Sequence, residues 1–143
     1  MDLKSAVTSA VSALEGASFE EDDGVYYLSV PTGDEDDADP RPVVVAVYAG
    51  EDGETIITRA EVGAYTDDID LAEVLRWIDS AIFARVYIGS ADDEEEGEAL
   101  VVEAGALSRT LDGDLLAQMA QEVADLADEI GAALFGDDDD EPA

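Results

Sequence analysis

The spacing of apolar residues along the chain predicts three helices, of which the last is the most regular. A first helix is expected from Asp2 to Gly16, with an apolar face formed by Leu3, Val7, Val11 and Leu14. In the last helix, apolar residues recur at alternating spacings of three and four, at Leu116, Met119, Val123, Leu126, Ile130 and Ala133. The opposite face of this last helix carries Glu122, Asp125 and Glu129, and Gly136 is placed to end it.

The remaining helical pattern covers about residues 70–82 and contains the chain's one tryptophan, Trp77. Asp70 is placed to cap this helix, and its predicted buried stripe is Leu71, Val74, Leu75, Ile78 and Ile82. Trp77 lies roughly 110° from the centre of that stripe. At this margin Trp77 is either a core-edge residue or an interface anchor, because tryptophan is enriched at binding hot spots. As an anchor it would pack across a homodimer or client interface.

Strand patterns fill the segments between the helices. Residues 17–22 and 24–30 are expected to pair across Asp23–Gly24, a dipeptide that favours tight hairpin turns. The segment 43–48 is apolar on both faces, which is typical of a central strand. Further strands are expected over about 55–65, 83–89 and 98–104. The segment from Pro31 to Pro42 holds three prolines and five acidic residues, and it is expected to be a loop outside the fold.

This order of elements predicts an α+β domain. It reads helix, four strands, helix, two strands, helix, and strands joined by short turns must be antiparallel. The expected architecture is an antiparallel sheet of about five to six strands, with three helices collected on one face. Residues 1–135 are expected to form one domain, and residues 136–143 a disordered acidic tail.

The charge of the chain is the feature of its composition that changes this picture most. There are 38 acidic residues and 6 basic ones, which gives a formal net charge of −32. Such a charge repels itself and opposes the compact state in dilute buffer. At about 1 M salt the Debye length falls to about 3 Å, and most of the repulsion is screened. The composition therefore predicts a halophilic protein whose acidic surface is adapted to concentrated salt.

Several kinds of chemistry are absent from the sequence. The chain has no cysteine and no histidine, and it contains neither of the common glycine-rich phosphate-binding loops. The acidic runs 34–39, 92–98 and 137–141 could gather cations weakly, but none matches a helix-flanked calcium loop. We therefore expect a protein that is not an enzyme, with no cofactor and no metal site.

The sequence also indicates where in the cell the protein is located and which partners it does not bind. No stretch approaches the ~18 apolar residues of a membrane helix, and no secretory signal is visible. A strongly anionic surface repels nucleic-acid phosphates and anionic lipid head groups. A cytoplasmic protein without direct nucleic-acid or membrane binding is expected.

The order of elements, together with a few local patterns, resembles a known family. The chain has an N-terminal amphipathic helix, the hairpin 22–25, valine-rich strands and a central helix, followed by the strands 83–88 and 100–102. It ends with a helix that contains Ala124–Asp125 and residues 126–128. Over about residues 1–135 this looks like the YbjN-like group, which shares the fold of type III secretion chaperones. The early extra strand and the segment 31–42 depart from the minimal chaperone pattern.

The resemblance implies that the protein binds other proteins. Type III secretion chaperones are small acidic dimers that hold a partly unfolded client, and YbjN-like proteins are linked to regulation or stress responses. No client-binding residue can be carried over to this chain. We expect a homodimeric, non-enzymatic protein-binding module, chaperone-like or adaptor, with an unknown client.

Two other classes of function remain as alternatives. One is an acidic DNA mimic or regulatory protein that binds a nucleic-acid-binding partner, and the other is an enzyme that uses carboxylates alone. The binding module requires an exposed apolar patch, and the mimic requires ordered acidic rows. The enzyme requires a concave pocket with a buried carboxylate.

Overall fold

The computed structural model describes residues 3–32, 41–51, 53–66, 69–79, 81–90, 98–132 and 134. The elements are α1 (Leu3–Ala13), β1 (Ser18–Asp22), β2 (Val25–Thr32), β3 (Arg41–Ala49), β4 (Thr55–Ala64), α2 (Leu71–Trp77), β5 (Ala84–Ser90), β6 (Glu98–Leu107), a short 3₁₀ turn (Ser108–Thr110) and α3 (Gly113–Gly131). The predicted α+β class and the predicted order of helices and strands are confirmed.

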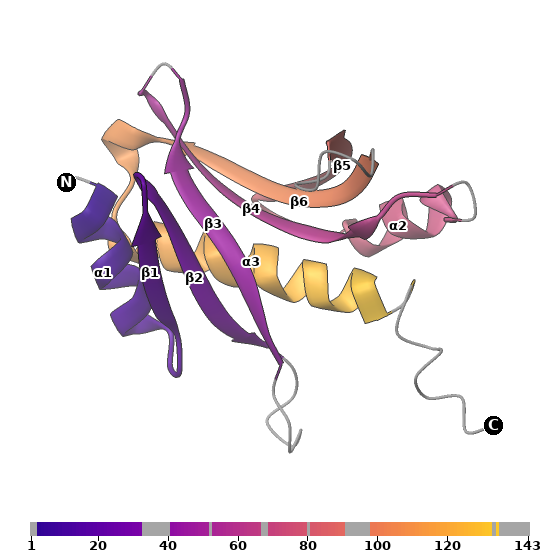
Figure 1. Ribbon diagram of the computed structural model, residues 1–143, viewed down its shortest axis with the longest axis horizontal. Coiled ribbons are helices and arrows are strands. Elements are labelled where there is room, and N and C mark those ends of the chain that lie inside the picture. Colours follow the sequence, from indigo (N-terminus) through magenta and orange to yellow (C-terminus); the bar gives the residue numbers. More distant parts are fainter. Residues whose placement is uncertain are drawn as a thin grey trace.

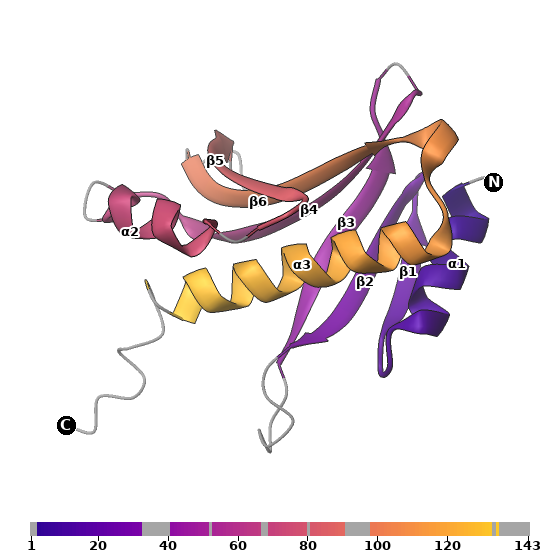
Figure 2. The same ribbon diagram turned by 180° about the vertical axis from the view of Figure 1, so that it is seen from behind.

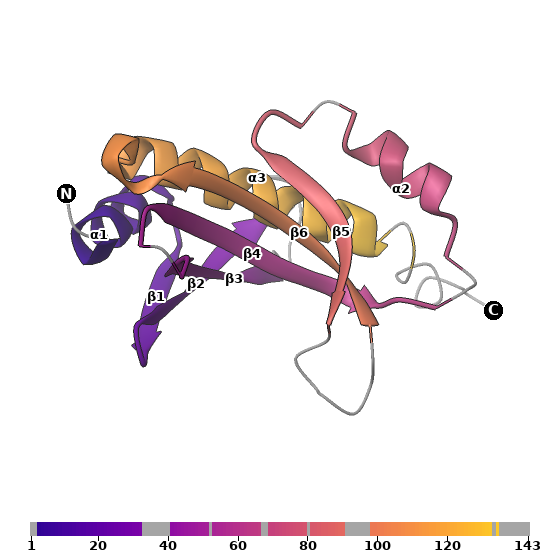
Figure 3. The same cartoon turned by 90° about the horizontal axis from the view of Figure 1, so that it is seen from above.

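The six strands form one antiparallel sheet in the order β1-β2-β3-β4-β6-β5. The helices α1 and α3 lie together against one face of this sheet, and no described helix covers the opposite face (Figures 1, 2 and 3). The strands β1 and β5 are the two edges of the sheet. We call the uncovered side the open sheet face.

The predicted hairpin and the predicted loop have different outcomes. Asp23 and Gly24 both have positive φ, at 58° and 87°, as a tight two-residue hairpin turn requires. The loop prediction for 31–42 was wrong at both ends, because Pro31 pairs with Pro42 near the end of the β2–β3 ladder. Prolines fit here because they stand at the margin of the ladder, where fewer backbone hydrogen bonds are needed. The acidic run 34–39 lies outside the described residues.

The core lies between α3 and the covered face of the sheet. The predicted apolar stripe of α3 is buried at Leu116, Met119, Val123, Leu126 and Ile130, whereas the side chain of Ala133 and residue Gly136 are not described. The sheet contributes the side chains that alternate toward the helices, among them Leu28, Val45 and Val102. The element α3 ends at Gly131.

The buried side of α1 is rotated from the predicted one. The buried residues are Ala6, Val7 and Ala10, whereas Leu3, Val11 and Leu14 are only partly buried. The small alanines allow α1 to approach α3 closely. At the contact, a Cβ added to Gly113 would overlap the side chain of Ser9. The predicted cap Asp2 lies outside the described residues.

The prediction for the central helix was wrong in both length and burial. The helix α2 ends at Trp77, and of its predicted stripe only Val74 is fully buried, with Ile78 partly so. The exposed fractions of Leu71, Leu75 and Ile82 are 39%, 61% and 80%. The reason is its position: α2 lies beside the C-terminal end of α3 instead of across the sheet, so only one side of it meets the core (Figures 1 and 2).

Candidate functional site

The exposed side of α2 is formed by residues that are neighbours on the helix surface. Asp70 starts the helix, since its Oδ1 accepts from the backbone N–H groups of Ala72, at 3.1 Å, and Glu73, at 3.3 Å. At 100° per residue, one continuous exposed sector of about 140° holds Leu71, Ala72, Leu75 and Arg76. We call these four residues the α2 face. It combines two large apolar side chains with one of the chain's 6 basic residues.

Trp77, the residue predicted as a candidate interface anchor, is the last residue of α2. Its side chain is not among those described, so the choice between a core-edge and an interface role stays a prediction. The signal of an unburied stripe comes instead from Leu71 and Leu75, which the sequence pattern assigned to the core.

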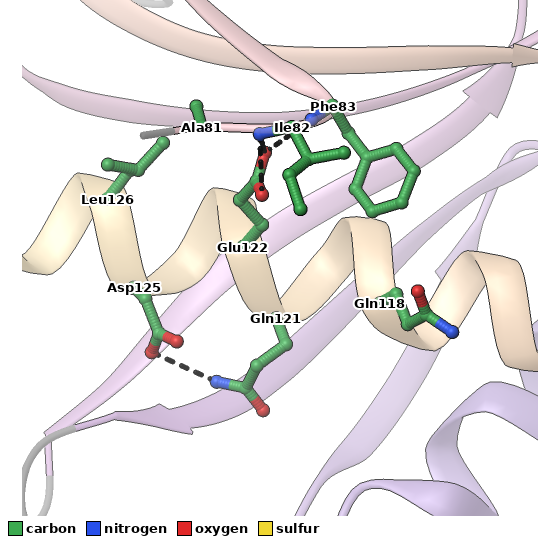
Figure 4. A pocket seen from close by; sticks show the side chains of 8 residues that line it. All are labelled: Ala81, Ile82, Phe83, Gln118, Gln121, Glu122, Asp125 and Leu126. Atoms are coloured by element: carbon green, nitrogen blue, oxygen red, sulfur yellow. Dashed lines mark hydrogen bonds between the residues drawn. The ribbon is translucent and has the colours of Figure 1, made fainter. Parts of the chain in front are cut away.

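A groove of about 420 Å³ lies between α3 and the segment that leads into β5 (Figure 4). Its lining residues are Ala81, Ile82, Phe83, Gln118, Gln121, Glu122, Asp125 and Leu126. Ile82 and Phe83 form an apolar wall on one side of Glu122, Leu126 lies beside Ala81 on the other side, and the floor on α3 carries amides and carboxylates (Figure 4). We call this site the α3 groove.

Glu122 holds the start of β5 against α3. Its carboxylate accepts from three successive backbone N–H groups, at 3.1 and 3.2 Å from Ile82 and at 2.7 Å from both Phe83 and Ala84. Hydrogen bonds to a charged acceptor are about twice as strong as neutral ones. The sequence pattern placed Glu122 on a solvated face, and periodicity alone gives no sign of this long-range contact.

Asp125 is the other carboxylate in the α3 groove. Burial raises the pKa of Asp125, and the neighbouring Asp128 raises it further, while a 3.0 Å hydrogen bond from the Gln121 amide acts in the opposite direction. Burial also raises the pKa of Glu129, with added repulsion from Asp125 and Asp128. Glu122 and Asp125 turn away from each other in Figure 4. Since Glu122 is bound to backbone, Asp125 is the carboxylate left to receive a ligand.

The open sheet face carries a row of side chains across five strands. Directly paired residues share a face, and the pairing runs from β2 to β5 through Tyr27, Ala46, Arg59, Glu103 and Arg85. Beside this row lies Val44, whose exposed fraction is 58%. Tyrosine and arginine with exposed aliphatic residues are typical of protein interfaces.

One end of this row is fixed by a polar cluster. Arg85 Nη2 donates to Glu103 Oε1 at 2.6 Å, and the Tyr87 hydroxyl donates to Glu103 Oε2 at 3.2 Å. The guanidinium of Arg85 also lies 5.2 Å from the centre of the Tyr87 ring. Burial raises the pKa of Tyr87, and Glu103 raises the pKa of Arg85 through their hydrogen bond. The cluster gives the open sheet face an ordered charged margin.

The described residues were also compared with the requirements of a metal site and of a membrane-spanning helix. In that part of the chain, no group of three or more potential ligand side chains could hold a metal ion. The acidic runs 34–39 and 137–141 fall outside it, as does the run 92–98 except for Glu98, which begins β6. Of the described helices, none combines the length and the apolar character needed to cross a membrane.

Comparison with known proteins relates the chain to one fold. No protein-family model matches the sequence, and no curated protein sequence matches it. A similar solved structure is that of YbjN, a proposed transcription regulator from E. coli, with a TM-score of 0.60 and 15% sequence identity. The match covers 93% of each chain. At this identity the likeness shows the fold and not the function, and the chain has a YbjN-like fold.

Proposed function

We propose that the protein is a homodimeric, non-enzymatic protein-binding module of the cytoplasm that joins two copies through the α2 face. The observation that carries the proposal is the exposure of Leu71 and Leu75 on a helix whose sequence is patterned for burial. A fully buried leucine contributes about 1.5–3 kcal/mol relative to an exposed one. A second copy that covers the α2 face would recover part of this free energy.

The test is the molar mass of two matched variants in about 2 M KCl, where screening limits the repulsion between copies. Leu75→Glu places a charge on the α2 face and is expected to give monomers. Val44→Glu places the same charge on the open sheet face and is expected to leave the dimer intact. Sedimentation that shows the same mass for Leu75→Glu and the wild type would contradict the proposal.

The client surface in this proposal is the open sheet face. Tyr27 is 41% exposed there, and Val44 is its diagonal neighbour on β3, two residues from its direct partner Ala46. Captured proteins from a salt-adapted host's lysate at about 2 M KCl are expected to bind the wild type and Leu75→Glu, and to be lost with Val44→Glu. A partner retained by Val44→Glu would mean that the client uses another surface.

We also propose that the acidic surface is an adaptation to concentrated salt. The support is the net charge of −32, which opposes compaction in dilute buffer. Near-UV circular dichroism is expected to show tertiary structure in molar KCl and its loss in low-salt buffer. A spectrum that does not change with salt would contradict this part of the proposal.

A second candidate function is a regulator that binds a nucleic-acid-binding protein through acidic residues. Two observations favour it: the YbjN-like fold, with YbjN itself a proposed transcription regulator, and the neighbouring carboxylates Asp125, Asp128 and Glu129 on α3. A single DNA-binding protein as the captured partner, displaced by duplex DNA, would support this function. Capture that DNA does not affect would count against it.

A further inference from the structure

We propose that the α2 face of one copy docks into the α3 groove of a second copy, with Arg76 paired to Asp125 across the interface. This inference rests on the proposed homodimer and specifies its geometry. The helix α2 lies near the C-terminal end of α3 (Figures 1 and 2). The groove lies on the middle of α3, from Gln118 to Leu126, and its other wall is the segment 81–83, which follows α2 closely in the chain.

The first evidence that a second copy occupies the α3 groove is the charge of the two surfaces. Of the described residues that line the α3 groove, Glu122 and Asp125 are carboxylates and none is basic. Arg76 is exposed and makes no ion pair with any residue in the described part of the chain. In a chain with only 6 basic residues, an exposed arginine beside an exposed leucine is the cation that this surface offers.

The hydrogen-bonding groups of the groove suit a guanidinium. Gln121 already donates to Asp125 Oδ1, and within the described part of the chain no hydrogen bond reaches Oδ2. Gln118 and Gln121 carry amide oxygens that can accept further N–H groups. The forked donors of arginine can therefore bridge a carboxylate oxygen and a neighbouring amide.

The apolar parts match as well. Ile82 is 80% exposed and forms the apolar wall of the groove together with Phe83. Leu75 is next to Arg76 on the exposed sector of α2, so it can reach this wall when Arg76 reaches Asp125. Docking would cover both Leu75 and Ile82.

Two-fold symmetry makes the contact reciprocal. In an isologous dimer, residue i of one copy contacts residue j of the other, and j contacts i. Each copy supplies one α2 face and one α3 groove, so a dimer would hold two Arg76–Asp125 pairs. Neither surface would be left uncovered.

The experiment uses two charge-reversed variants of the full chain, Arg76→Glu and Asp125→Arg, in about 1 M KCl. Each alone places like charges at both contacts, and each is expected to weaken self-association by about tenfold or more. When the two variants are mixed, the introduced glutamate of one copy faces the introduced arginine of the other, and the second contact keeps the original Arg76 and Asp125. The expected result is a heterodimer as tight as the wild-type dimer within about threefold.

The mixture distinguishes a contact between two copies from a contact within one copy. In each variant alone, residues 76 and 125 carry like charges, so only pairing between the two different variants restores opposite charges. Asp114→Arg is the matched control, since it reverses an exposed charge on α3 outside the groove and is expected to leave the dimer unchanged. Near-UV circular dichroism of each variant checks that it is folded.

Two outcomes would overturn the inference and are distinct from failure of the proposed function. If Leu75→Glu gives monomers but the mixture forms no heterodimer, the α2 face self-associates through some other contact. If Asp125→Arg keeps the wild-type dimer, the groove is not the docking site. A wild-type chain that is monomeric at all concentrations would instead reject the homodimer itself.

Discussion

The helices α2 and α3 have the same kind of amphipathic sequence and reach opposite outcomes. The element α3 spans 19 residues against the sheet, and its predicted apolar side chains from Leu116 to Ile130 are buried. The element α2 spans 7 residues at the end of α3, and it leaves two leucines exposed. An apolar stripe on a helix predicts that this side of the helix will be buried. It does not predict whether the burying residues belong to the same chain or to a partner.

The largest expected difference between the two helices is in the cost of truncating a leucine. Leu116→Ala removes a fully buried side chain and is expected to lower the free energy of unfolding by about 2–5 kcal/mol. Leu75→Ala is expected to change it by about 0.5 kcal/mol or less when the chain is dilute enough to be monomeric. Urea unfolding in molar KCl measures both. Equal losses would mean that α2 is part of the core.

The next effect concerns the close approach of α1 to α3. Gly113→Ala is expected to lower the free energy of unfolding by about 1–3 kcal/mol, because the added Cβ overlaps Ser9. Gly131→Ala is the control at the other end of α3, where the added Cβ would lie 3.7 Å from Val62 Cγ1, an ordinary contact. A neutral Gly113→Ala would show that the α1–α3 contact is looser than described.

A smaller effect is expected at the start of α2. Asp70→Ala removes the acceptor for two backbone N–H groups and is expected to destabilise α2 by about 1 kcal/mol. Faster amide hydrogen exchange at residues 72–76, with exchange in α3 unchanged, measures this loss. Asp70→Ser keeps a side-chain acceptor and is expected to restore most of the protection.

The smallest expected effect is the pH dependence at Asp125. Its pKa is raised in the folded chain, so the folded state binds a proton more readily than the unfolded state. The resulting destabilisation is present above the folded pKa, and it is relieved as the pH falls from there toward the ordinary aspartate value. Unfolding followed over this range should show a shallower pH dependence for Asp125→Asn. An unchanged slope would show that Asp125 is as well solvated in the folded chain as in the unfolded one.

Local patterns in the sequence predicted most of the fold. The Asp23–Gly24 turn, the central strand at 43–48 and the face of α3 follow from rules that act within a few residues. The position of α2 at the end of α3 could not be predicted, because periodicity does not place a helix in space. For the same reason, the pattern assigned Leu75 to the core.

The candidate site was less accessible from the sequence than the fold. The α3 groove depends on Glu122 accepting from the backbone N–H groups of Ile82, Phe83 and Ala84, about forty positions away in the chain. Nothing in the local pattern distinguishes Glu122 from the other acidic residues of α3. The exposed stripe of α2 becomes a candidate interface only when its sequence pattern is compared with its burial.

The most direct test of the account is the molar mass of the wild-type chain and of Leu75→Glu across a range of concentrations in molar KCl. If two copies join through the α2 face, the wild type approaches twice its 15.0 kDa chain mass, while the variant remains at 15.0 kDa. A wild-type chain that stays at the monomer mass, or a variant that dimerises equally well, would contradict it.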